Sequence, residues 1–336
     1  MQIEENTSLA LFTTFHIGGP ARFFARVQNI EDIKESLNFA RDRNLTTFIL
    51  GGGSNVLFDD VGFDGLVLKV EFTGVEEGEN SYVVGSGESW DALVARAVQK
   101  GLWGMENLSG IPGTVGGAVV QNIGAYGQAL SQTLMWVEAY NTESGELDKI
   151  NAEDCKLGYR DSIFKKQRGK YIVLRACLTL SHTPTPELSY KDLAEHFTGI
   201  SPSLNEIRKT VLDIRERKFP KLTEEGTAGS FFKNPIVPAQ EALKLQRKYP
   251  KMPLFRLPES ENIKIPLGWF LDYRHGVLDM RGIKVGGARM YEKQFLVLVV
   301  EKNTSSRDVK KLARLVQEKI FTTCGIKIEP EVYIME

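Results

Sequence analysis

Apolar residues follow two different spacings along the first 180 residues of the chain. Short runs rich in β-branched and aromatic residues predict strands at residues 21–27, 46–50, 66–70, 82–84, 134–140 and 171–180. Apolar residues three and four positions apart predict helices at residues 30–40 and 90–98, the second opened by Ser89 as N-cap and closed by Gly101. This alternation of strands and helices favours mixed layers of α and β structure.

The sequence changes in character at Ser181, where a loop rich in proline, serine and threonine begins. Ser203 and Glu206 have the spacing of a capping box, which predicts a helix from residue 204 that ends near a domain boundary around residue 218. The last third of the chain predicts a strand at 295–301, a helix opened by Ser305 or Ser306, and a strand at 326–334.

Composition narrows the class of protein. The 336 residues correspond to about two domains, and 42% hydrophobic residues suffice for sizeable cores. With 42 basic against 43 acidic residues, the chain has no electrostatic footprint for nucleic acid, and its apolar runs are far shorter than the ~20 residues that span a bilayer. We expect no signal peptide. Three cysteines without close pairing suit a reducing cytoplasm, and four scattered histidines predict no metal site.

Glycine is enriched, with 31 residues, many of them between Gly51 and Gly127. The two common nucleotide fingerprints do not occur: G-x-G-x-x-G fails at Val56, and G-x-x-x-x-G-K-[ST] has no match. The stretch 51–55 follows a predicted strand, and the stretch 107–127 lacks periodicity and is predicted to be an irregular loop. Each loop is either a tight turn or an anion-binding backbone concavity. Two such loops in one domain favour a long cofactor that carries phosphate.

Two charged motifs offer further chemistry. In GYRDSIFK, Arg160 beside Asp161 is either half of a structural ion pair or a fixed cation that clamps a carboxylate. In IEPEVYI, Glu329 and Glu331 share a face if the segment is a strand, and the alternative to a functional role is a solvent-exposed charged strip. Both motifs therefore leave a structural explanation open.

A third motif, AGSFFKNP, places Ser230 between a glycine and two phenylalanines. Taken alone, this serine is a turn hydroxyl, because serine is a weak acid. Taken alone, Lys218 and Lys233 are also interpreted as solvated lysines, and Asn234, which precedes a proline, as a turn residue. These residues acquire a specific meaning only together with the other motifs.

The motifs GGGSNVLF, IPGTVGGAVVQNIGAYG, GYRDSIFK, AGSFFKNP and EPEVYI occur in this order along the chain. In their order and spacing the chain resembles the UDP-N-acetylenolpyruvoylglucosamine reductase (MurB) family, the flavoenzymes of peptidoglycan precursor synthesis. The resemblance runs from FTTFHIGGPA, which begins at residue 12, to the C-terminus. SYKDL at residues 189–193 resembles the substrate-loop tyrosine segment of the longer type within this family.

The resemblance implies an α+β fold in three parts. Residues 1–70 and 71–218 would be the two subdomains of an FAD-binding domain of the vanillyl-alcohol-oxidase (PCMH) type, and residues 219–336 a smaller α/β substrate-binding domain. The implied reaction reduces UDP-N-acetylglucosamine enolpyruvate to UDP-N-acetylmuramate, with NADPH as reductant and FAD as cofactor. The implied setting is a cytoplasmic monomer that acts on a UDP-sugar, without nucleic acid or membrane partners, in cell-wall biogenesis, cell shape and cell division.

The resemblance also implies site residues. Ser230 would donate a proton, and Arg160 and Glu331 would act at the substrate carboxylate, Glu331 only if it is protonated and donates a hydrogen bond. The residues implied for FAD are Gly51, Gly52, Gly53, Ser54, Asn55, Gly113, Thr114, Gly116, Gly117, Asn122, Gly124, Ala125 and Tyr126. Those implied for the UDP-sugar are Tyr190 on a mobile loop, Arg215, Lys218, Asn234 and Gln294. Arg215 has the alternative of pairing with Glu216 or Asp213 on its own helix.

The chain departs from the family pattern at Pro266 and Leu267, where small residues are expected, and at Tyr291, where a histidine is common. We expect these positions to affect packing or the rim of the substrate domain. Two rival functions stay open: another FAD-dependent oxidoreductase of the same superfamily, and a non-catalytic protein that binds a UDP-sugar.

Overall fold

The computed structural model describes residues 2–257, 260–275 and 277–335, which divide into two compact units. Unit 1 contains Met1–Thr7, Pro20–Gly53 and Phe63–Glu216, and unit 2 contains Ser8–Gly19, Ser54–Gly62 and Arg217–Glu336. Two short N-terminal segments thus belong to the unit that holds the last third of the chain. The division into three parts at residues 70 and 218 stays a prediction.

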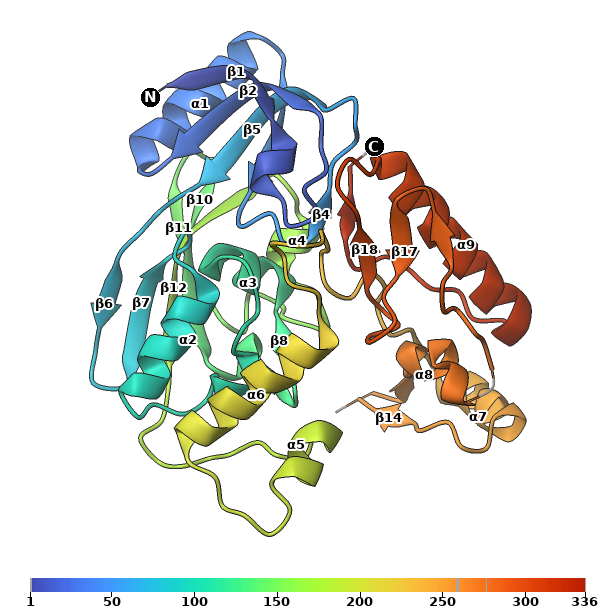
Figure 1. The fold of residues 1–336 in the computed structure, drawn as a ribbon. Helices are drawn as coiled ribbons and strands as arrows, with labels where there is room; N and C mark the ends of the chain where they lie inside the picture. The colour runs from blue at the N-terminus through green and yellow to red at the C-terminus, as the bar shows by residue number, and fades with distance from the viewer. Residues whose placement is uncertain (1, 258–259, 276, 336) are drawn as a thin grey trace. The chain divides into compact units, whose positions relative to one another are not determined.

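The first sheet of unit 1 is built around parallel strands. Its order is β1 (Ile3–Ser8), β2 (Pro20–Val27), β5 (Phe63–Val70) and β3 (Thr46–Leu50), and β5 pairs in parallel with both β2 and β3. The helix α1 (Ile30–Asp42) connects β2 to β3 and packs its apolar face on this sheet (Figure 1). The buried side chains of this layer include Ala25, Ile33, Ala40, Leu66 and Leu68.

The second sheet of unit 1 is antiparallel. Its order is β11 (Leu147–Asn151), β10 (Leu134–Asn141), β12 (Tyr171–Thr179), β7 (Ser81–Gly85) and β6 (Val75–Glu77). The helices α2 (Trp90–Gln99), α3 (Val115–Gln121) and α6 (Leu204–Lys218) share one hydrophobic core with this sheet. This core therefore fixes both ends of the segment that carries the second glycine-rich stretch.

The helix starts follow the predicted caps. Ser89 and Ser305 each accept a hydrogen bond from the N–H three residues on, and so open α2 and α9 (Ser306–Cys324). Ser203 and Glu206 form the capping box of α6, with 2.7 Å between the Ser203 N–H nitrogen and Glu206 Oε2 and 3.4 Å between the Glu206 nitrogen and Ser203 Oγ. Because each cap satisfies an unpaired N–H, local sequence alone marks these starts, and all three helix predictions are confirmed.

The prediction that residues 107–127 form an irregular loop is wrong. The stretch contains α3 and the strand β8 (Gly124–Ala125), which pairs with β9 (Gln128–Ala129). The helical sequence VGGAVVQ hides α3, because glycine and valine have weak helix propensity and the helix is only about two turns long. Burial of Val115, Ala118 and Val119 in the core of the second sheet stabilises this helix despite its composition.

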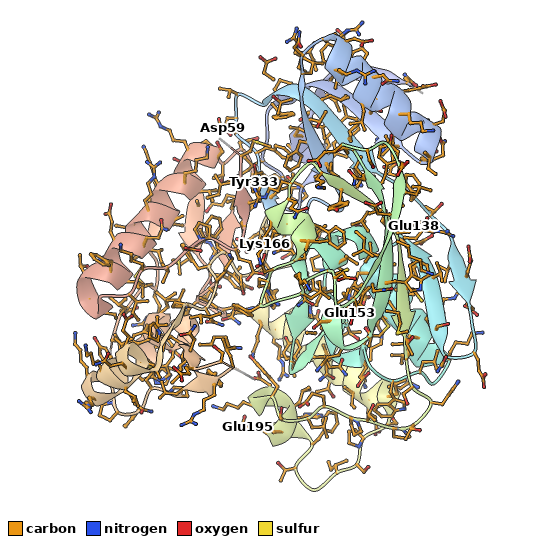
Figure 2. The ribbon with its side chains drawn as sticks, turned by 180° about the vertical axis from the view of Figure 1, so that it is seen from behind. Asp59, Glu138, Glu153, Lys166, Glu195 and Tyr333 are labelled. Carbon is orange, nitrogen blue, oxygen red and sulfur yellow. The ribbon has the colours of Figure 1, made fainter. Side chains whose placement is uncertain are left out.

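Unit 2 packs α9 on a small sheet of β16 (Lys284–Val285), β17 (Ala288–Met290) and β18 (Leu298–Val300) (Figure 1). The same hydrophobic core includes residues of α7 (Ala239–Lys248), α8 (Leu267–Leu271) and a second sheet of β13 (Ile236–Pro238), β15 (Asn262–Lys264) and β14 (Phe255–Arg256). The segment 54–62 contacts the rest of unit 2 in two ways. Its strand β4 (Val56–Leu57) pairs in parallel with β19 (Tyr333–Ile334), and Asp59 forms an ion pair with Lys310. Asp59 and Tyr333 are labelled in Figure 2.

The predicted strand at residues 326–334 is wrong over most of its length, since only β19 at its end is a strand. Ile326 and Ile328 are buried while the residues after them are exposed, which is the alternation that suggested a strand. Pro330 has no N–H to donate and interrupts a regular ladder. The segment instead forms an isolated bridge between Pro330 and Phe232. The strand predicted at 295–301 is also shorter, since β18 covers only its last part.

Candidate active site

The two glycine-rich stretches meet in unit 1. A Cβ on Gly52 would lie 2.6 Å from the Cα of Gly113, and a Cβ on Gly51 would lie 3.1 Å from Thr114 Oγ1. Real Cβ atoms essentially never approach other atoms as closely as 2.6 Å, so this approach of two backbones requires glycine at position 52. The structure thus brings together backbone from both stretches that sequence reasoning assigned to the cofactor.

The second stretch is held from behind by the loop before α2. The backbone N–H of Gly116 donates to Ser86 O at 2.8 Å, and that of Val115 donates to Glu88 O at 2.9 Å. A Cβ on Gly116 would lie 2.8 Å from the Cβ of Ser86. Glycine at 116 is therefore explained by packing against Ser86, while Gly117 has room for a Cβ, with its nearest neighbour at 3.7 Å.

The far end of the second stretch is anchored by Asn122. This residue ends α3 in the left-handed region at φ 41°; its Nδ2 donates to Gly158 O at 2.7 Å, and its Oδ1 accepts from the Ser131 N–H at 3.1 Å. Gly124 and Ala125 follow in the β8–β9 hairpin. The amide of Asn122 thus ties the second stretch to the loop that contains Arg160.

Arg160 is held at both its backbone and its side chain. It has φ 55°, a left-handed conformation that is unfavourable for a residue with a side chain. Its Nη2 donates to the carbonyl of Gly124 at 2.6 Å. Asp161, the partner in the structural alternative, forms an ion pair with Lys166 at 2.8 Å. A strained backbone at a chemically competent residue is a frequent property of functional sites.

Three of the predicted residues cluster in unit 1 around a buried tyrosine. The rings of Tyr126 and Tyr190 pack edge to face with 5.2 Å between centroids, and the hydroxyl of Tyr126 is hydrogen-bonded to the Arg215 guanidinium. Arg215 Nε also donates to Gly110 O at 3.0 Å. Burial raises the pKa of Tyr126 to about 12 and lowers the pKa of Arg215, so the cluster combines a neutral hydroxyl with a poorly hydrated cation.

Sequence reasoning missed Asn107, whose side chain bonds to the backbone that carries this cluster. The side chain is fully buried, and its Nδ2 donates to the carbonyls of both Tyr126 and Glu187 at 2.7 Å. It therefore fixes the backbone under Tyr126 and the chain that leads to Tyr190. Glu106, also fully buried, accepts from a glutamine and a backbone N–H in the same region. Neither residue belongs to a motif, so no sequence signal indicated them.

Ser230 lies in unit 2 on a segment whose backbone is tied down on both sides. It forms a bridge with Val297, and the next residue, Phe231, donates its N–H to Leu296 O at 2.7 Å. Phe231 and Phe232 are buried in the core of unit 2, whereas Ser230 is only partly buried. The two phenylalanines thus anchor the segment and leave the serine at the edge of the core.

Glu331 lies on a segment that is hydrogen-bonded to Phe231, the residue after Ser230. Its N–H donates to Phe231 O at 2.7 Å, and its own carbonyl accepts from Asn55 Nδ2 at 3.2 Å. Glu331 is partly buried, while Glu329 has a side chain 80% exposed and pairs with Lys233 at 3.9 Å. A role as a solvent-exposed charge therefore fits Glu329, whereas it does not explain Glu331, whose side chain is partly buried.

The remaining predicted substrate residues also lie in unit 2. Asn234 Oδ1 accepts from the Leu267 N–H at 2.9 Å, at the start of α8, and this hydrogen bond orients the side-chain amide. Gln294 lies in the turn whose carbonyl accepts from Val297, the residue that bridges to Ser230. Lys218 is the last residue of α6 and is partly buried. Ser230 and Glu331 thus share unit 2 with these residues, whereas Arg160 belongs to unit 1.

The three departures from the family pattern lie at packing positions of unit 2. Leu267 is fully buried in the core, directly after Pro266 at the start of α8. Tyr291 is 5% exposed and packs with Val297 and Val299. Leu267 thus shares a hydrophobic core with the two phenylalanines that follow Ser230, and Tyr291 packs with Val297, the residue that bridges to Ser230.

Comparisons with known proteins match both parts of the chain. An FAD binding domain model matches residues 21–151, and the model of the UDP-N-acetylenolpyruvoylglucosamine reductase C-terminal domain matches residues 221–335. UDP-N-acetylenolpyruvoylglucosamine reductases from Ralstonia nicotianae and Amoebophilus asiaticus are 37% and 36% identical, over 98% and 100% of both chains. The crystal structure of the enzyme from Thermus caldophilus superposes with a TM-score of 0.72 at 25% identity over 100% of both chains. The predicted α+β fold with an FAD-binding domain is confirmed, and the chain belongs to the UDP-N-acetylenolpyruvoylglucosamine reductase family.

Proposed function

We propose that this chain reduces UDP-N-acetylglucosamine enolpyruvate to UDP-N-acetylmuramate with NADPH and FAD, in the synthesis of peptidoglycan precursors. The observation that carries the proposal is the hydrogen bond between Glu331 N–H and Phe231 O, since it joins the segments of Ser230 and Glu331 in one unit. These are the residues that the family pattern assigns to proton delivery and to the substrate carboxylate. Family membership over the full length supports the same reaction.

The residues of the paired glycine stretches fit a flavin dinucleotide. Gly51, Gly52, Gly113 and Thr114 present closely spaced backbone with little side chain, which suits the approach of a pyrophosphate. We assign FAD to these residues, with Gly53, Ser54, Asn55, Gly117, Ala125 and Tyr126 beside them. Gly116, Asn122 and Gly124 then act by holding this backbone, through hydrogen bonds to Ser86, Gly158 and Arg160 respectively. When bound, FAD supplies the hydride chemistry.

Ser230 delivers the proton that balances the added hydride. Hydride addition at C3 of the enolpyruvyl group leaves the electron pair at C2, beside the carboxylate, and a proton at C2 completes the saturated ether. Serine is a weak acid, but a carbanion-like centre is so strongly basic that a weak acid suffices. The buried phenylalanines on the C-terminal side of Ser230 restrict its position, which lowers the entropy lost in reaching a reactive geometry.

Arg160 and Glu331 act on the charge that spreads into the substrate carboxylate. A guanidinium stabilises a developing anion most when it is already in position and need not reorganise. Arg160 meets this condition, because its backbone is fixed in a left-handed conformation and its Nη2 donates to the carbonyl of Gly124. Glu331 contributes if it is protonated and donates a hydrogen bond to the carboxylate. Each residue is positioned within its own unit by backbone hydrogen bonds.

The UDP moiety is held by Tyr190, Arg215, Lys218, Asn234 and Gln294. Arg215 is the strongest of these assignments, because burial removes its guanidinium from water and lowers its pKa, and a diphosphate bound beside it would stabilise the positive charge through paired hydrogen bonds. Tyr190 keeps 43% of its surface exposed while it packs on Tyr126, so it is accessible to a ligand without losing its own support.

The protein would act as a monomer in the cytoplasm, without nucleic-acid partners, and would contribute to cell shape and division through precursor supply. Within the described part of the chain, every helix is too short or too polar to span a bilayer. Light scattering of the purified protein at several concentrations would measure the mass in solution, and a mass of two chains would contradict the monomer.

Anaerobic mixing of the purified flavoprotein with NADPH, and then with the enolpyruvyl sugar nucleotide, tests the reaction. We expect the flavin absorbance to bleach in the first step and to recover in the second. Recovery only with dioxygen would favour an oxidase of the same superfamily. Colourless protein that releases no flavin on denaturation would favour a non-catalytic UDP-sugar-binding protein.

A further inference from the structure

Lys165 closes the GYRDSIFK motif, and the proposed reaction gives it no role. It lies in the short helix α4 (Ile163–Lys166) and is partly buried. Its Nζ donates to the backbone carbonyl of Arg160 at 2.9 Å and also to Gln121 Oε1. Most lysine ammonium groups lie in solvent. A lysine that instead donates hydrogen bonds to the backbone of the arginine to which a catalytic role is assigned is therefore unusual.

The carbonyl that Lys165 binds belongs to the residue with φ 55°. A left-handed conformation is strained at a residue with a Cβ and persists only when its surroundings hold it. A glycine would remove this strain but would also remove the guanidinium. Arg160 is therefore held at two points, its carbonyl by Lys165 and its Nη2 by the carbonyl of Gly124.

The frame around Lys165 is fixed. Ser162 Oγ donates to Val120 O at 2.7 Å and accepts from the Lys165 N–H at 3.1 Å, which anchors α4 to the end of α3. Gln121, the second acceptor for Lys165, is the last residue of α3. Since Gln121 lies within the second glycine-rich stretch, Lys165 connects that stretch to Arg160.

We propose that Lys165 is the positioning residue for Arg160: it holds the arginine backbone in its left-handed conformation, so that the guanidinium is presented to the substrate carboxylate. This inference rests on the proposed function. It assigns to Lys165 no contact with substrate and no part in proton transfer. Its effect should therefore be confined to ligands that carry the carboxylate.

The test compares two nucleotides that differ in this group. UDP-N-acetylmuramate carries the carboxylate and UDP-N-acetylglucosamine does not. Both would be titrated into the oxidised holoenzyme, with the change in flavin absorbance or the heat of binding as the signal. For Lys165→Met we expect affinity for UDP-N-acetylmuramate to fall about ten- to a hundredfold, the range expected when a hydrogen bond to a charged group is lost. Affinity for UDP-N-acetylglucosamine should stay within about twofold, and flavin reduction by NADPH should keep its rate.

Lys166 provides the matched control. It is the next residue of the same helix and is labelled in Figure 2; its side chain is 61% exposed, and its ion pair with Asp161 lies at the surface. Lys166→Met removes the same charge from the same helix, so both affinities should be unchanged. If Lys165→Met folds without FAD, Lys165→Gln replaces it, because glutamine is neutral and too short to reach the Arg160 carbonyl, and the same selective loss is expected.

A double-mutant cycle separates positioning from direct contact. In an Arg160→Ala background, Lys165→Met should cause little further loss of affinity for UDP-N-acetylmuramate, because its effect passes through the arginine. Fully additive losses, equal losses for both nucleotides, or wild-type affinity in Lys165→Met would each overturn the inference. Failure of the proposed function would look different: the wild-type flavin would not be reoxidised by the enolpyruvyl sugar nucleotide at all.

Discussion

The side-chain amide of Asn55 donates a hydrogen bond to the backbone carbonyl of Glu331, with 3.2 Å between Nδ2 and the oxygen. The N–H of Tyr333 donates in return to the carbonyl of Asn55 at 3.0 Å, and the parallel pairing of β4 with β19 continues the contact. The last residue of the first glycine-rich stretch is thus hydrogen-bonded to the backbone of Glu331, the glutamate for which a catalytic role is predicted. Within unit 2, Asn55 sets the position of the Glu331 segment.

Replacing Asn55 by alanine should slow the second half of the reaction more than the first. The lost hydrogen bond is worth roughly 1 kcal/mol, which corresponds to about fivefold to tenfold in the rate of flavin reoxidation by the enolpyruvyl substrate. Reduction by NADPH, measured per bound flavin, should change less, because the lost side-chain hydrogen bond holds the Glu331 segment. Stopped-flow measurement of the two half-reactions checks this. Glu329→Gln is the control, since Glu329 is exposed and should affect neither rate; equal slowing of both halves in Asn55→Ala would contradict the positioning role.

Ser230→Ala should separate the two half-reactions sharply. Flavin reduction by NADPH needs no proton at C2 and should survive, whereas reoxidation by the enolpyruvyl sugar should fall about 10²- to 10⁴-fold, the usual contribution of a general acid. The same rapid-mixing experiment measures both rates. Equal loss in the two halves would refute the assignment of Ser230 as proton donor.

Glu331→Gln should retain much of the activity if hydrogen-bond donation is the whole role of this residue. Glutamine keeps a donor of similar size, while Glu331→Ala removes it and should lower kcat with the enolpyruvyl substrate about tenfold or more. Steady-state kinetics of the two variants check this prediction. Near-total loss in Glu331→Gln would mean that the carboxyl group itself is needed.

Local signals in the sequence predicted the helices and strands whose starts are marked by a cap or by a β-branched run. The caps at Ser89, Ser203 and Ser305 and the β-branched run at 46–50 correspond to observed helix and strand starts, because a cap or an alternating pattern is a short-range property. The helix VGGAVVQ was hidden for the opposite reason: its stability comes from burial against β12, which lies about 50 residues further along the chain.

The site divides in the same way. Motifs predicted roles for Arg160 and Ser230, but they did not indicate how the chain holds these two residues in place. The left-handed conformation of Arg160 depends on contacts from Gly124 and Lys165, and the buried hydrogen bonds of Asn107 depend on Glu187, 80 residues away. Long-range contacts of single polar side chains leave no periodicity or spacing in a single sequence, so sequence reasoning could not find them.

Gly52→Ala should weaken FAD binding by pushing the two glycine stretches apart. Its Cβ would meet the Cα of Gly113 at 2.6 Å, and backbone cannot move aside as a flexible side chain can. Such overpacking costs about 1–3 kcal/mol. The purified variant should contain less FAD per chain and regain it only at higher FAD concentrations. Gly158→Ala is the control, because a Cβ there meets only ordinary contact at 3.6 Å. Full FAD occupancy and unchanged affinity in Gly52→Ala would show that the stretches tolerate separation.

Tyr126 should make the protein lose stability above pH 10. Burial raises the pKa of its hydroxyl from the ordinary tyrosine value of 10 to about 12. The folded state therefore holds this proton more tightly than the unfolded chain, and the resulting stability is fully present below pH 10 and is lost as the pH rises towards 12. The contribution is at most about 3 kcal/mol, with a slope near 1.4 kcal/mol per pH unit in that window. Thermal denaturation of wild type and Tyr126→Phe between pH 9 and roughly 11.5 isolates this group, because the other tyrosines and lysines titrate in both proteins. The wild type should lose stability more steeply than the variant, which has no proton to lose at this position, and parallel curves would mean that the Tyr126 hydroxyl titrates alike in the folded and unfolded chains.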